Sequence, residues 1–381
     1  MCRIAQDRPH DRPCLGSVGD MRRTRGRSVE VDDLDDFDRR LASGATQLTG
    51  WHLQGLDLSD RRVELRHADV AGALFLGCRF GNGDEESVRA RGAVVFPTVP
   101  GVPVDTYRTS LYTADELYDT TDYATSLDAR AYAWSQQPAD RDATLAQALH
   151  DRAMDDALTA WVDARSLVGV MGGHALQRGD SGYADAALLG HLLGQTRIVA
   201  TGGGPGAMEA ANLGAYLSPA PRGALTEALA LLAAVPSYRP DVSAWAATAF
   251  SVRERWPGGG ESLGIPTWHY GHEPPNPFPS AIAKYFRNAM REAILLEVCD
   301  AGIAFLPGSA GTAQEIFQDA CENFYADESS VALMVLVGRG YWTEEMPAWP
   351  LLRQIARGHP MESAVHLVDT VEEAAALMAG A

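Results

Sequence analysis

Lysine is nearly missing from this chain of 381 residues, and acidic residues outnumber basic ones. Lys284 is the only lysine, the other basic residues are arginines, and the formal net charge is −18. Nucleic acids and anionic membranes both require basic surface on their partners. We therefore expect neither as a partner. A small anionic ligand is not excluded, because a few arginines in one cleft can make that cleft positive despite the negative net charge.

Cysteine pairs and long apolar runs are missing as well. The five cysteines are scattered and form no Cys-x-x-Cys pair, so we expect no disulfide framework, no structural zinc and a cytoplasmic location. No apolar run approaches the roughly 18 residues of a spanning helix. The first 30 residues lack the apolar stretch of a secretory signal. Residues 1–28 show no periodicity, and we predict disorder there, with Met21 as an alternative start.

The pattern of residues 30–95 differs from that of the rest. Apolar residues recur there at roughly five-residue intervals, as in LQGLDLSD and AGALFLGCRF. This predicts a small β-rich module, either with plain alternating strands or with a few coils of a pentapeptide-type solenoid. For residues 96–162 we predict a proline-punctuated linker followed by a helical segment.

Residues 163–381 alternate regularly between short apolar runs and helical patterns. SLVGVMG, RIVATGGG and AGIAFLPG each read as a buried strand ending in glycine, and each precedes a helical pattern, the second of which covers 207–216. The alternation predicts an α/β fold, a Rossmann-like parallel sheet with helices on both faces. Ligands of such sheets bind at the carboxyl ends of the strands, where the glycines fall.

The first glycine turn is GGGPGAM, Gly202 to Met208. Glycines between a strand and a helix let a phosphate approach the backbone and the helix start. The same glycines could serve only tight packing. The spacing also satisfies a dinucleotide fingerprint, but that reading needs an acidic residue after the next strand, where the sequence has a loop and a helix instead. We therefore do not favour an NAD-linked oxidoreductase.

The second glycine turn is PGSAGTAQE, Pro307 to Glu315. It again joins a predicted strand to a helix and adds the hydroxyls of Ser309 and Thr312. Glu315 lies one turn into that helix. It is either a site carboxylate or the partner of Thr312 in a capping box.

Upstream of the second turn, residues 280–298 predict one long amphipathic helix. It would contain Lys284, Arg287 and Arg291, the last two an i, i+4 pair on one face.

Together the two turns resemble the LOG family, the cytokinin riboside 5′-monophosphate phosphoribohydrolases once named lysine decarboxylases. The family pattern is GGGxxGxM followed by R…PGGxGTxxE. GGGPGAM matches the first part, and Arg291 with PGSAGTAQE matches the second, Ser309 replacing a family glycine. The resemblance covers about 165–325. The segment 267–286 (TWHYGHEPPNPFPSAIAKYF) is similar to a longer bacterial subgroup.

The resemblance implies hydrolysis of the N-glycosidic bond of a nucleoside 5′-monophosphate, without a cofactor, by a homodimer or higher homo-oligomer. It implies a catalytic role for Glu315 and Arg291. The residues expected to bind the substrate or its phosphate are Gly203, Gly204, Gly206, Met208, Gly308, Ser309, Gly311 and Thr312.

Other readings compete with this one. The chain could bind or sense a nucleotide without hydrolysing it, although retention of both Arg291 and Glu315 favours an enzyme. Glu209 is a second candidate carboxylate, or a residue that complements the helix dipole. His269, His272 and Glu273 suggest a metal but lack further ligands, and we expect none. Pyridoxal phosphate chemistry would need Lys284, which has no matching context.

Overall fold

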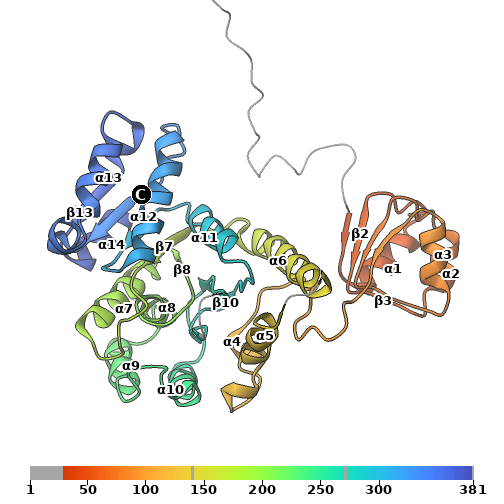
Figure 1. Cartoon of the computed structure of the whole chain (residues 1–381), viewed down its shortest axis with the longest axis horizontal. Helices are drawn as coiled ribbons and strands as arrows, with labels where there is room; N and C mark the ends of the chain where they lie inside the picture. Colours follow the sequence, from red (N-terminus) through yellow and green to blue (C-terminus); the bar gives the residue numbers. More distant parts are fainter. Residues whose placement is uncertain (1–28, 139–140, 270–272, 380–381) are drawn as a thin grey trace, which may run out of the picture. The chain divides into compact units, whose positions relative to one another are not determined.

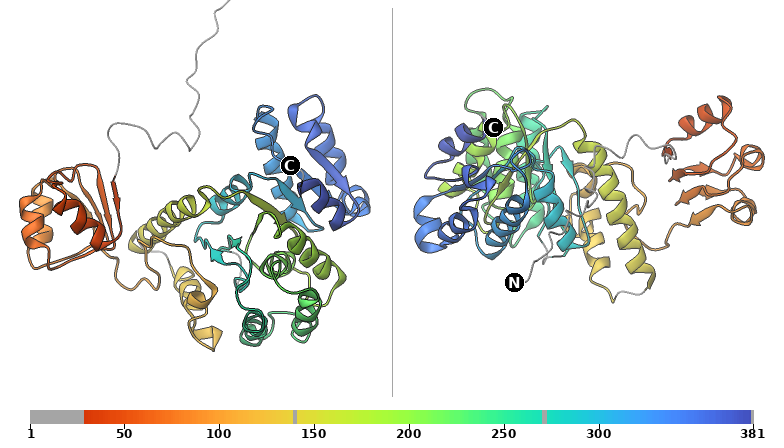
Figure 2. Two further views of the ribbon diagram at one scale, coloured as in Figure 1. Left: turned by 180° about the vertical axis from the view of Figure 1, so that it is seen from behind. Right: turned by 90° about the horizontal axis from the view of Figure 1, so that it is seen from above.

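The computed structural model describes residues 29–138, 141–269 and 273–379. The chain divides between Thr98 and Val99 into two compact units, each described by itself (Figures 1 and 2). The predicted disorder of residues 1–28 lies outside the described residues. Among the described helices, none combines the length and the hydropathy that crossing a bilayer requires.

The first unit is a solenoid of strand–helix repeats. Four strands pair in parallel, with partners 22, 22 and 20 positions apart. Gly50, Gly72 and Gly92 hold the same place before successive strands with φ of 76°, 73° and 91°, a conformation that favours glycine. The elements are β1 (Val29–Val31), α1 (Leu34–Ala42), β2 (Trp51–Gln54), β3 (Asp57–Leu58), α2 (Arg62–His67), β4 (Leu74–Leu76), β5 (Arg79–Phe80), α3 (Asp84–Ala90) and β6 (Val94–Phe96).

The repeat therefore differs from the five-residue interval in the sequence. Five residues separate the two glycine turns on either side of one strand, such as Gly50 and Gly55 or Gly72 and Gly77. Each whole repeat is about four times longer and includes a helix, so the unit is not a purely β-rich module.

The second unit contains the predicted parallel sheet. Its seven strands lie in the order β10-β9-β8-β7-β11-β12-β13, and every pairing is parallel. The order reverses at β7, whose neighbours are β8 and β11, so the topological switch point lies there. The strands are β7 (Leu167–Met171), β8 (Ile198–Thr201), β9 (Ser262–Gly264), β10 (Ala281–Ile282), β11 (Ile303–Phe305), β12 (Met334–Val337) and β13 (Val365–Val368).

Helices cover both faces of this sheet, which confirms the predicted fold class. On β7, Leu167 and Met171 face one core while Val168 and Val170 face the other, as the alternation of a strand requires. α7 (Ser181–Leu193), α8 (Ala207–Tyr216), α9 (Ala224–Leu232), α10 (Val242–Arg255) and α14 (Val371–Ala379) pack on one side; α11 (Asn288–Glu297), α12 (Ala310–Tyr325) and α13 (Ala348–Ala356) pack on the other.

The helical segment predicted within 96–162 is present, and it packs against the sheet. Leu117, Ala131 and Met154 belong to the core on the α11–α12 side. The segment contains α4 (Ala114–Leu117), the 3₁₀ turn η2 (Tyr123–Thr125), α5 (Leu127–Ser135) and α6 (Arg141–Val162).

The long helix predicted over 280–298 is wrong in its first half. The chain forms β10 there, and α11 starts only at Asn288. Lys284 is fully buried, with Nζ 2.5 Å from Asp128 of α5. The carboxylate of Asp151, on α6, accepts the N–H groups of Phe286 and Arg287 at 2.9 and 3.0 Å. These tertiary contacts outweigh local helix propensity, and Lys284 does not share a helix with Arg291.

Candidate functional site

The second glycine turn opens at the switch point, directly after β11. α12 begins at Ala310 with Ser309 as its N-cap, and no side chain caps it. Its first N–H groups therefore lack intrahelical acceptors and suit an anion. A Cβ at Gly311 would meet no atom within 4 Å, so this part of the turn borders open space.

The capping-box alternative for Glu315 is wrong. Because the helix starts at Ala310, Thr312 already lies inside its first turn and Glu315 almost a turn further on. Glu315 instead faces Arg291, with Oε1 4.0 Å from Nη1. Burial raises the pKa of Glu315 to about 7, and the Arg291 charge opposes that rise.

Arg291 is held in place by backbone carbonyls. It lies in the first turn of α11, its Nε donates to Ile265 O at 2.7 Å, and Nη2 donates to Gly202 O at 3.3 Å. Its side chain is only 11% exposed. The guanidinium therefore has little freedom, and it links the end of β8 to α12.

The first glycine turn is filled by protein atoms rather than open. A Cβ at Gly202 would lie 2.4 Å from Arg291 Nη2, and one at Gly203 would lie 2.7 Å from Pro266. Gly206, with φ of 76°, packs against Gly173 O and His174. The close approach that the sequence suggested for a ligand is thus made largely by neighbouring protein groups.

A cavity of about 460 Å³ joins the two turns. Of the predicted site residues, the structure brings Met208, Arg291, Ser309, Gly311, Thr312 and Glu315 together in its lining. Gly203, Gly204, Gly206 and Gly308 lie behind or beside it. The remaining lining residues are Met171, Gly172, Gly173, His174, Glu273, Glu292, Ala310 and Gln314.

Sequence reasoning missed His174, Glu292 and Gln314 in this lining, and it considered Glu273 only as a possible metal ligand. His174 follows β7, and its Nε2 lies 4.0 Å from Glu273 Oε1. Glu273 also places Oε2 3.9 Å from where a Cβ of Gly204 would be. Both residues follow strands at the carboxyl edge of the sheet, the position that could have pointed to them. The cavity is therefore lined by two carboxylates besides Glu315, those of Glu273 and Glu292.

Among the described residues, the other candidates named from the sequence do not contribute to this cavity. His269 does not line the cavity, His272 lies outside the described residues, and the described residues contain no group of three His, Cys, Asp or Glu that could hold a metal ion. Glu209 is fully buried in an ion pair with Arg178, so its charge is already balanced there. Lys284 does not line the cavity either.

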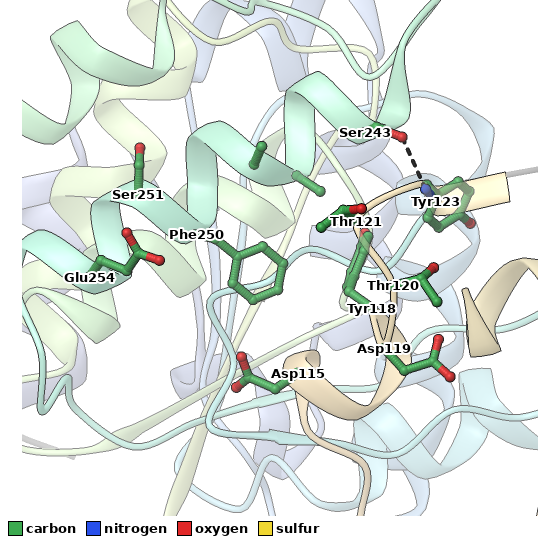
Figure 3. A pocket seen from close by; sticks show the side chains of 12 residues that line it. Asp115, Tyr118, Asp119, Thr120, Thr121, Tyr123, Ser243, Phe250, Ser251 and Glu254 are labelled. Carbon is green, nitrogen blue, oxygen red and sulfur yellow. Dashed lines mark hydrogen bonds between the residues drawn. The ribbon is translucent and has the colours of Figure 1, made fainter. Parts of the chain in front are cut away.

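A second cavity, of about 420 Å³, lies between α10 and the segment that follows α4 (Figure 3). Phe250 and Tyr118 face each other there with ring centroids 5.6 Å apart. This cavity has neither a glycine turn nor the Arg291–Glu315 pair. Tyr118 nonetheless reaches the main site indirectly, since its hydroxyl donates to Pro275 O at 2.6 Å.

Comparison with known proteins assigns no function. No family model and no curated protein matches the chain. Among solved structures, it is similar to a molybdenum cofactor binding protein from the phototrophic bacterium Rippkaea orientalis (15% identity, TM-score 0.35, 57% of this chain and 96% of that one). It is also similar to the molybdenum cofactor carrier protein of Chlamydomonas reinhardtii (16%, 0.36, 57% and 97%) and to the protein TM1055 (20%, 0.34, 57% and 99%). At these identities and TM-scores the likenesses carry no information on ligand or reaction.

Proposed function

We propose that the cavity hydrolyses the N-glycosidic bond of a nucleoside 5′-monophosphate and releases the free base and ribose 5-phosphate. The observation that supports this most is the placement of Glu315 and Arg291, 4.0 Å apart beside an uncapped helix start. A phosphate site needs only the helix start. The paired carboxyl and guanidinium next to it supply what bond cleavage requires.

The 5′-phosphate would bind at the start of α12. The unpaired N–H groups and the positive end of the helix dipole attract it, and Ser309 and Thr312 offer hydroxyls. Gly311 leaves room for the phosphate oxygens, since no atom lies within 4 Å of its absent Cβ. Backbone groups thus replace the lysines that the sequence lacks.

Glu315 would act on the ribose, about a turn further along α12. The glycosidic bond breaks with its electron pair leaving on the base nitrogen, and positive charge develops at C1′ and the ring oxygen. An ionised Glu315 stabilises that charge and accepts a proton from the water whose oxygen bonds to C1′. The departing base takes up a proton from solvent. Arg291 keeps Glu315 more ionised than burial alone would allow.

The test is to incubate the protein with each 5′-monophosphate and to measure free base and ribose 5-phosphate. We expect release from at least one nucleotide, and none from Glu315→Gln, which should still bind phosphate. Glu322→Gln is the matched control, because Glu322 lies on the same helix but is exposed and outside the cavity. Nucleotide binding without release from any monophosphate would refute hydrolysis and favour a sensor. Full activity of Glu315→Gln would refute the assigned role.

A further inference from the structure

Asn276 is a fully buried polar residue near the cavity that the proposed chemistry does not use. It has no exposed surface, and it lies in a run of buried residues from Pro274 to Pro279. This segment follows β9 and leads to β10. A buried amide requires hydrogen-bond partners, and those of Asn276 all lie on the first glycine turn or beside it.

The backbone and side chain of Asn276 both hold the turn. Its N–H donates to Gly203 O at 2.8 Å, and Nδ2 donates to Gly204 O at 3.1 Å. Its Oδ1 accepts the N–H of Phe278 at 3.2 Å, which fixes the orientation of the amide. The side chain therefore holds a specific orientation against the turn.

Two further residues close this network from the sheet side. Asn276 Nδ2 also donates to Asn212 Oδ1 at 3.1 Å, and Thr201 Oγ1 donates to the same oxygen at 2.7 Å. Thr201 Oγ1 in turn accepts the N–H of Gly203 at 2.9 Å. Both partners are fully buried. Gly203 is thus bound through its N–H on one side and its C=O on the other.

The same segment carries Glu273 over the cavity. Glu273 lies three residues before Asn276, and its carboxylate sits above Gly204, facing His174. Tyr118 fixes the residue between them by donating to Pro275 O. The neighbouring Gly202 carbonyl is one of the two that hold Arg291. A shift of the turn would therefore move groups on both sides of the substrate.

We propose that Asn276 is a positioning residue, whose amide locks the first glycine turn and thereby sets the places of Arg291 and Glu273 around the substrate. The proposal rests on the hydrolase function for its kinetic consequence. Its structural consequence, a turn held by the Asn276 amide, does not depend on turnover. Asn276 has no contact with the start of α12, so phosphate binding there should be independent of it.

Asn276→Asp tests this with little change in volume. Ionised, the new carboxylate would face Gly204 O and Asn212 Oδ1 and repel both; protonated, it can donate to one of them. Burial among oxygens raises the pKa of such a carboxyl. We expect activity relative to wild type to be nearest normal at about pH 6, and to fall roughly 100-fold by about pH 9. Affinity for inorganic phosphate should stay unchanged at both pH values.

Amide hydrogen exchange of the peptide 200–208 gives the readout that needs no turnover. We expect faster exchange than in wild type at about pH 9 and near-normal exchange at about pH 6. Asn323→Asp is the matched control, since Asn323 is also buried but its Nδ2 has no acceptor within the described part of the chain. Unchanged exchange at the higher pH would overturn the proposal, whether or not the wild type hydrolyses nucleotides. An activity ratio that is the same at both pH values would overturn the kinetic part alone.

Discussion

The two glycine turns look alike in sequence but differ in what occupies the space beside them. At the first turn the space is taken by protein: Arg291 at Gly202 and Pro266 at Gly203. At the second, Gly311 borders the cavity, and the helix behind it starts without a cap. Both turns lie at the carboxyl edge of the sheet. Only the second has open space beside a helix start that no side chain caps.

This difference shows that a glycine can be needed to leave space either for another protein group or for a ligand. In either case a Cβ would occupy space that another atom needs. At the first turn that atom belongs to Arg291, which is then aimed at Glu315. The first turn therefore contributes to the site indirectly, as a support for a charged side chain, and the two turns should respond differently to the same substitution.

The largest effect is expected for Gly202→Ala. The new Cβ would lie 2.4 Å from Arg291 Nη2 and 2.7 Å from Met208 Sδ. Both are atoms of flexible side chains, so the fold should persist while the guanidinium moves. We expect kcat/KM to fall roughly 100-fold or more, because misplacement by about 1 Å can cost that much. Steady-state kinetics measures kcat/KM, and thermal unfolding checks that the fold persists.

Gly203→Ala is the control for this prediction. Its Cβ would meet Pro266 and the backbone at Ile265, and its φ is 69°. That change should lower the free energy of unfolding by about 1–3 kcal/mol. If Gly202→Ala instead proved as unstable as Gly203→Ala with normal turnover, the supporting role of Gly202 for Arg291 would be wrong.

The next effect is the pH dependence of turnover. The pKa of Glu315 is raised to about 7 by burial, and the proposed role needs the ionised form. We expect kcat/KM to rise about tenfold per pH unit below that value and to level off above it. In Gly202→Ala the inflection should move upward, since the Arg291 charge that lowers this pKa is displaced. A rate that falls as the pH rises through 7 would make Glu315 an acid instead.

At the second turn, Gly311→Ala should weaken phosphate binding without lowering the stability of the protein. Its Cβ would meet no protein atom within 4 Å, and the residue lies in the first turn of α12. Stability should be unchanged or rise by up to about 1 kcal/mol, the helix-propensity gain. Affinity for inorganic phosphate should fall about tenfold, corresponding to about 1.4 kcal/mol. Calorimetry with phosphate measures this, and unchanged affinity would place the phosphate elsewhere.

The sequence predicted those parts of the fold that local patterns encode. The helix predicted over 207–216 has those bounds, because a glycine turn precedes it and its apolar positions are regular. The first half of the helix predicted over 280–298 failed, because Asp128 and Asp151, more than 130 positions earlier, fix that segment. The period of the solenoid was predicted wrongly. The two turns in each repeat lie five residues apart, and this short spacing obscured the repeat of 20 to 22 residues.

For the candidate site, too, the sequence predicted only what local patterns encode. Glycines and hydroxyls before a helix predicted an anion site at the second turn from local chemistry alone. Only the family resemblance suggested that Arg291 and Glu315 act together, since nothing local links residues on different helices. The roles of Gly202 and Asn276 were beyond reach, because both depend on which distant atoms fill the space around one turn.

The last prediction concerns the contribution of Glu315, in the second turn, to the stability of the protein. Burial raises the pKa of Glu315 from the ordinary value of 4.5 to about 7, so the folded protein holds this proton more tightly than the unfolded chain. Stability should then fall as the pH rises from about 4.5 to about 7. Glu315→Gln has no such proton. By thermal or urea unfolding it should be more stable than wild type by about 1–3 kcal/mol at about pH 8, with a smaller difference at about pH 5. Glu328→Gln, at an exposed position just after α12, should show a much smaller change. Equal stability of Glu315→Gln and wild type at both pH values would mean that this carboxyl is well solvated. The contrast between a first turn packed with protein and a second turn that buries a carboxyl beside open space would then fail.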